Sequence, residues 1–67
     1  MYSIEKARIR IEHWMSHNDH HREEYDAFAK DLEDLGKSVS AGHVRELIDL
    51  ASKSNDCLKR ALKGLDE

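Results

Sequence analysis

Residues 4–35 read IEKARIRIEHWMSHNDHHREEYDAFAKDLEDL, and apolar residues recur along this stretch at helical spacing. Its two core heptad positions continue without slippage from one end to the other. They hold Ile4, Ala7, Ile11, Trp14, Asn18, His21, Tyr25, Phe28, Leu32 and Leu35, and eight of these ten are apolar. Alternating spacings of three and four residues are typical of a helix that packs against another helix. The sequence therefore predicts a long helix over about residues 3–35, with Ser3 as its N-cap.

A second helix is predicted over about residues 41–64. Gly36 is the expected C-cap of the first helix, and residues 36–40 form the turn, where Ser38 or Ser40 would cap the second helix. The second apolar stripe is interrupted only by Asn55 and consists of Val44, Leu47, Ile48, Ala51, Leu58, Ala61, Leu62 and Leu65. A turn this short makes the helices antiparallel neighbours. We therefore expect residues 1–67 to form a single all-α domain, an antiparallel two-helix hairpin.

An alternative architecture breaks the first helix near residues 16–19, where Ser16 and Asp19 resemble a cap, and gives a three-helix bundle monomer. The heptad pattern continues through this point and no glycine or proline stands there, so the unbroken helix is favoured. The longer first helix would then leave apolar residues beyond the end of its partner. Exposed apolar surface of this kind favours a second copy, and two hairpins would pair as a homodimeric four-helix bundle.

Composition excludes several classes of function. The 67 residues carry 11 basic and 14 acidic side chains, a net charge of −3, and no basic stripe follows either predicted helix, so nucleic-acid binding is disfavoured. No apolar run approaches the ~20 residues that span a membrane. Cys57 is the only cysteine and has no internal disulfide partner. We therefore expect a cytoplasmic protein.

Four histidines occur within nine residues, at positions 13, 17, 20 and 21. Residues three and four apart are neighbours on a helix surface, so His17, His21 and Glu24 share one face in the order His-x3-His-x2-Glu. Neutral imidazole together with carboxylate suits zinc, nickel, cobalt or iron(II). The leading prediction is a transition-metal site with His17, His21 and Glu24 as ligands.

Further residues are expected to support this site. Pairing of the two helices places Asn18 and His21 at the level of Ser54, Asn55 and Cys57. Buried polar groups must satisfy one another or bind a ligand. The residues predicted to orient or supplement the metal ligands are Trp14, Asn18, His20, Asn55 and Cys57.

An enzymatic role is not supported by the motifs. The zinc peptidase helix has the order His-Glu-x-x-His, but here Asn18 follows the first histidine, and an amide cannot act as a general base. There is also no glycine-rich phosphate loop. The alternative to metal binding is a non-catalytic homo-oligomerisation or protein-interaction module. Its histidine and asparagine residues would form a polar layer that fixes register, as buried asparagine does in coiled coils, or that responds to pH.

The run His13-Trp14-x-x-His17-Asn18-x-x-His21-x-x-Glu24 resembles a signature of small uncharacterised helical domains in archaea and bacteria. In those domains the stretch opens a two-helix unit. The resemblance covers residues 8–35 well and extends loosely over the second helix. It implies that Trp14 and Asn18 belong to one unit with the three predicted ligands, and it implies no particular activity.

Overall fold

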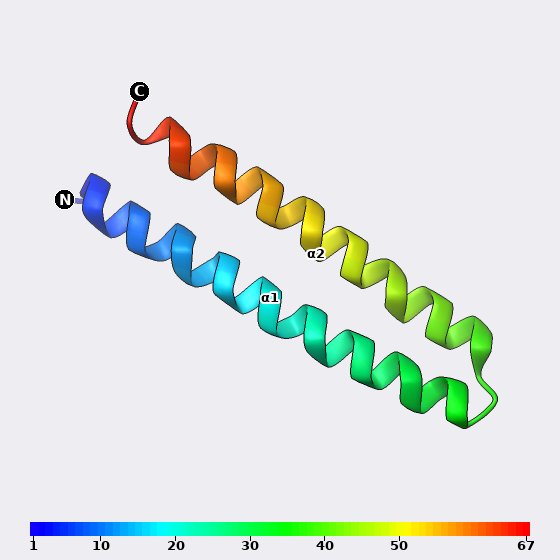
Figure 1. Cartoon of the computed structure of the whole chain (residues 1–67). Coiled ribbons are helices and arrows are strands. Elements are labelled where there is room, and N and C mark those ends of the chain that lie inside the picture. Colours follow the sequence, from blue (N-terminus) through cyan, green and yellow to red (C-terminus); the bar gives the residue numbers. More distant parts are fainter.

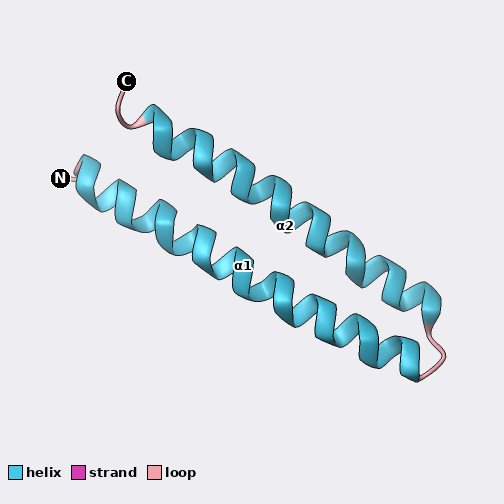
Figure 2. Cartoon of the chain, in the orientation of Figure 1, coloured by secondary structure: helices cyan, strands magenta, loops and turns pink.

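The computed structural model describes all 67 residues as two antiparallel helices, α1 (Ile4–Asp34) and α2 (Ser38–Gly64), with both termini at one end (Figure 1). The hairpin is 51 Å long and 15 Å across in both other directions. No strand is present (Figure 2). The predicted hairpin is confirmed. The three-helix alternative is wrong, because α1 continues through residues 16–19 and Arg22 pairs with Asp19 one turn earlier at 3.3 Å.

Both ends of α1 follow the sequence signals. The Ser3 hydroxyl accepts a hydrogen bond from the backbone N–H of Lys6 at 3.1 Å, which satisfies a free donor of the first turn. Gly36 has a positive φ of 75°. Its N–H donates to the Glu33 carbonyl at 2.9 Å, and that of Lys37 donates to the Leu32 carbonyl at 2.8 Å. This pair of bonds is the Schellman motif, which ends α1 and turns the chain toward α2.

The start of α2 differs from the prediction. The helix begins at Ser38, three residues before the expected start near 41, and its N-cap is Lys37, which makes no side-chain capping bond. The predicted serine caps are wrong because the chain leaves the Schellman turn already helical, and the Ala41 N–H donates to the Lys37 carbonyl at 3.0 Å. As a result α1 and α2 have similar lengths, 31 and 27 residues. Most of the predicted overhang is absent, because Arg8 already pairs with Asp66 at 2.8 Å.

Little of the chain is buried. Only Ala29, Ala41 and Asn55 are removed from solvent. The row of α1 residues nearest α2 alternates between two sets, Ile11, Asn18, Tyr25 and Leu32 with Arg8, Met15, Arg22 and Ala29, all half-buried except Ala29. Half of the residues that were predicted to face the core of the hairpin therefore do not lie nearest α2, and the residues of the second set take their place there. Trp14 and Phe28 remain 49% and 54% exposed, because a single neighbouring helix covers a narrower strip than the apolar stripe occupies.

Candidate functional site

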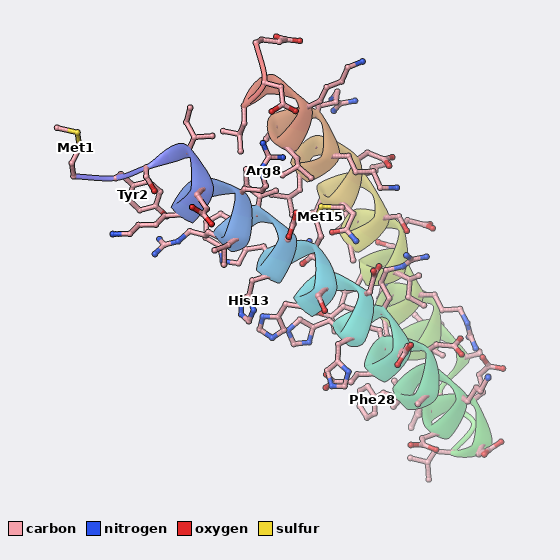
Figure 3. All side chains as sticks on the ribbon, turned by 60° about the vertical axis from the view of Figure 1, so that its left-hand side comes forward. Met1, Tyr2, Arg8, His13, Met15 and Phe28 are labelled. Carbon is pink, nitrogen blue, oxygen red and sulfur yellow. The ribbon has the colours of Figure 1, made fainter.

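Three of the four clustered histidines form a row along α1. His13, His17, His21 and Tyr25 lie on successive turns, with ring centroids 6.0, 4.4 and 5.8 Å apart. The rings of His17 and His21 stack at an interplanar angle of 29°. Figure 3 shows His13 projecting from α1 away from α2, whereas Arg8 and Met15 point toward α2. His13 and His17 are exposed on this surface of α1, whereas His21 is half-buried.

Glu24 lies between two imidazoles. Its Oε1 atom is 3.2 Å from Nε2 of His20 and 3.4 Å from Nδ1 of His21. These spacings of four and three residues are those at which helical side chains meet. The side chains of His20, Glu24 and His21 are 69%, 54% and 40% exposed, so water and salt screen the pairs, and such pairs contribute at most about 1 kcal/mol each. Stability alone gives little reason for this arrangement.

The structure brings the three predicted metal ligands onto one face without converging them. His17 stacks on His21, and Glu24 contacts His21. Stacked rings present their faces to each other, so their nitrogens do not meet at one point. No group of three or more histidine, cysteine, aspartate or glutamate side chains in one chain is arranged to hold a metal ion.

A polar layer between the helices is built on Asn55, which is 6% exposed. Its Oδ1 accepts from Asn18 at 2.9 Å, and its Nδ2 donates to Oδ1 of Asp19 at 3.0 Å and to the carbonyl of Met15 at 3.3 Å. Asn18 also donates to the Ser54 hydroxyl at 3.1 Å. The predicted layer therefore exists, and Asp19, which sequence reasoning missed, belongs to it.

Two predicted members lie outside this layer. Asn18 hydrogen-bonds Asn55, so His21 lies about one turn further along α1, and it makes no hydrogen bond with Asn55. Cys57 is exposed, and its sulfur accepts a hydrogen bond from Arg60 on its own helix at 3.3 Å. The prediction for both residues was wrong because the short turn shifts the pairing of α2 along α1 by about one turn.

One side of the hairpin carries apolar residues from both helices. His21 comes eight residues before the buried Ala29, and Leu47 comes eight residues before the buried Asn55, so each lies about 80° around its helix from the line of contact. Both helices are right-handed and they run in opposite directions. Turning through the same angle from the line of contact therefore brings His21 and Leu47 to the same side of the hairpin. We call this side the apolar face, and it comprises Trp14, His21 and Phe28 from α1 and Leu47, Leu50, Ala51 and Leu58 from α2.

The opposite side of the hairpin is charged. There Arg8 pairs with Asp66, and Glu33 pairs with Arg45, so ion pairs cross from one helix to the other near both ends. Asp19 contacts Asn55 between them. On the side of the apolar face, the hydrogen bond that joins the two helices runs from Asn18 to Ser54, and neither of these side chains is charged. The two faces therefore differ sharply in polarity.

A shallow groove runs along the N-terminal half of α1. Its lining consists of Tyr2, Lys6, Ile9, Arg10, His13 and Trp14. The Arg10 guanidinium lies over the Tyr2 ring at 5.5 Å and over the Trp14 ring at 6.0 Å. These cation–π contacts hold Trp14 at the edge where the groove meets the apolar face.

Comparison with known proteins places the chain in a family. Neither helix contains a segment long and apolar enough to cross a membrane. No curated protein matches the chain significantly, and no solved structure does. The model of a family described as a domain of unknown function, DUF8180, matches residues 7–65, and the chain belongs to that family.

Proposed function

We propose that the chain is a self-association module in which two hairpins pack through their apolar faces into a homodimeric four-helix bundle. The observation that carries this proposal is that very few residues are buried while several large apolar side chains are exposed. Three of 67 residues are buried, while Trp14, Phe28, Leu47 and Leu50 are between 41% and 58% exposed on one face. Large apolar side chains gathered in this way mark an interaction surface.

The hairpin exposes more surface than a compact protein of its mass, and the excess is about the area that one partner buries in a stable interface. The hairpin exposes 5259 Å². A compact protein of 7.8 kDa exposes roughly 4,400 Å², so this chain carries an excess of roughly 900 Å². Each partner of a standard stable interface buries about 800 Å². An interface of this standard size would remove nearly all of the excess.

A second copy of the chain suits this face better than an unrelated partner. The face occupies the central part of the hairpin, from Trp14 to Phe28 on α1 and from Leu47 to Leu58 on α2, so a copy presents a face of the same length and the same apolar character. A two-fold axis would bury both apolar faces together and leave both charged faces in water. The resulting four antiparallel helices are the usual arrangement of a small bundle.

Sedimentation of two matched variants tests self-association. Phe28→Glu places a charge in the proposed interface, and Ile9→Glu places one on the outer side of α1 at a similar exposure, 61% against 54%. We expect wild type and Ile9→Glu to sediment as dimers and Phe28→Glu as a monomer, because burying an unpaired charge is costly. A monomeric wild type, or a dimer unaffected by Phe28→Glu, would contradict the proposal.

Metal binding is a second candidate function. It is supported by the contact of Glu24 with His21 and by the adjacent His17 ring, which gather imidazole and carboxylate on one face. The fitting ions are zinc, nickel, cobalt and iron(II). In this proposal Trp14, Asn18, His20 and Asn55 support the ligands, and the exposed Cys57 is a distant thiol.

Melting of chelator-treated protein with each of the four ions tests the second candidate. An ion at a hundred times its dissociation constant stabilises the native state by about 2.7 kcal/mol, which raises Tm by about 10 °C or more in a chain of this size. We expect one ion to raise Tm in wild type and not in His21→Ala. Equal melting temperatures with and without every ion would eliminate metal binding.

A further inference from the structure

We propose that the two-fold axis of the homodimer passes beside His21, so that His17, His21 and Glu24 of both copies form one shared site for a divalent transition metal. This inference rests on the self-association proposed above and adds its register and its ligand.

The apolar residues of α1 are arranged symmetrically about His21. Trp14 precedes His21 by seven residues and Phe28 follows it by seven, while Ala7 and Leu35 lie fourteen residues away on either side. When two copies of a helix pack antiparallel about an axis at one residue, each residue before it meets the residue equally far after it in the partner. Trp14 would then contact the partner's Phe28, about 10.5 Å from the axis.

The apolar residues of α2 place the two-fold axis at the same level along the hairpin, independently of the residues on α1. The hydrogen bond between Asn18 and Asn55 fixes the pairing of the helices, and three residues further along the hairpin His21 is level with Ser52. Leu47 and Leu58 lie five residues before and six residues after Ser52. An axis at this level therefore also pairs Leu47 with the partner's Leu58, and one axis satisfies both helices.

The axis brings the histidine rows of the two copies together. His21 lies on the apolar face beside the axis, and His17 and Glu24 lie within about one turn of it on the same side of α1. The two copies together supply four imidazoles and two carboxylates, whereas one chain gathers no three such groups.

Metal titration of the wild-type protein tests the shared site. Chelator-treated protein is titrated with Co²⁺, and binding is followed by visible absorption and by calorimetry. We expect half an equivalent of Co²⁺ per chain. His17→Ala and His21→Ala should each weaken binding at least tenfold, whereas His43→Ala should not, because His43 pairs only with Glu46 in the first turns of α2. One equivalent per chain, no binding, or binding unaffected by His21→Ala overturns the inference.

Sedimentation of the same samples separates the two proposals. A dimer that fails to bind Co²⁺ overturns the shared site and leaves self-association standing, whereas a monomer overturns both.

The register has its own test in a Cys57→Ser background. There His21→Cys should form a disulfide between copies on oxidation, because the Cα atoms beside an axis approach within bonding range, and His13→Cys on the outer side of α1 should not. Failure of His21→Cys to cross-link a dimeric protein overturns the register.

Discussion

Gly36 is the residue whose backbone conformation reverses the chain. Its φ of 75° is a conformation that L side chains avoid, and a Cβ added there would meet no atom within 4 Å. The cost of Gly36→Ala is therefore conformational strain alone, and we expect a loss of about 1 kcal/mol in the free energy of unfolding. Urea denaturation at one protein concentration measures it.

Gly42 provides the matched control. It lies within α2 with helical dihedral angles, and an added Cβ would again meet nothing within 4 Å. Gly42→Ala should therefore stabilise the chain by about 0.5–1 kcal/mol, because alanine loses less backbone entropy than glycine in a helix. If both substitutions changed stability in the same direction, the Schellman turn would not be the feature that closes the hairpin.

Asn55 is the one buried polar residue, and the bonds around it predict a large effect of its removal. Asn55→Ala deletes an acceptor for Asn18 and a donor for Asp19 and the Met15 carbonyl. We expect a loss of roughly 1–3 kcal/mol, because the remaining groups are left unpaired in a partly buried seam. Ser54→Ala, which removes one exposed acceptor, should change stability by less than about 0.5 kcal/mol in the same denaturation experiment.

At the scale of the elements, the sequence predicted what depends on local spacing. The unbroken heptad predicted the continuous α1, Ser3 and Gly36 predicted its ends, and the three- and four-residue spacings predicted that Glu24 would meet His21. The start of α2 was missed, because a Schellman turn passes directly into the helix and leaves Ser38 and Ser40 without a capping role.

The rotation of α1 about its axis was not predictable from its apolar stripe. That stripe is wide enough to face two neighbours, and the pattern does not say which half meets α2. The packing of Ala29 and the bonds of Asn18 settle the choice, and they turn Trp14 and Phe28 outward. The residues that sequence reasoning placed in the core of one chain thus become the apolar face of the candidate site.

At the scale of the whole molecule, shape and surface lead to the same conclusion. The radius of gyration of 15.6 Å exceeds the roughly 11 Å of a compact 67-residue domain. A rod with three buried residues lacks the core that normally offsets the entropy of folding in so short a chain. The proposed homodimer would supply the burial that the single hairpin lacks.

Folding that depends on association makes Tm depend on concentration. Unfolding of a dimer releases two chains, so each tenfold dilution lowers its stability by about 1.4 kcal/mol. With the usual unfolding entropy of about 2.1 cal/mol/K per residue for two chains, Tm should fall by about 5 °C per tenfold dilution. Circular dichroism melts over three decades of concentration measure this slope. Phe28→Glu should melt at a lower temperature that does not change with dilution, and a concentration-independent Tm for wild type would mean that the isolated hairpin is the folded unit.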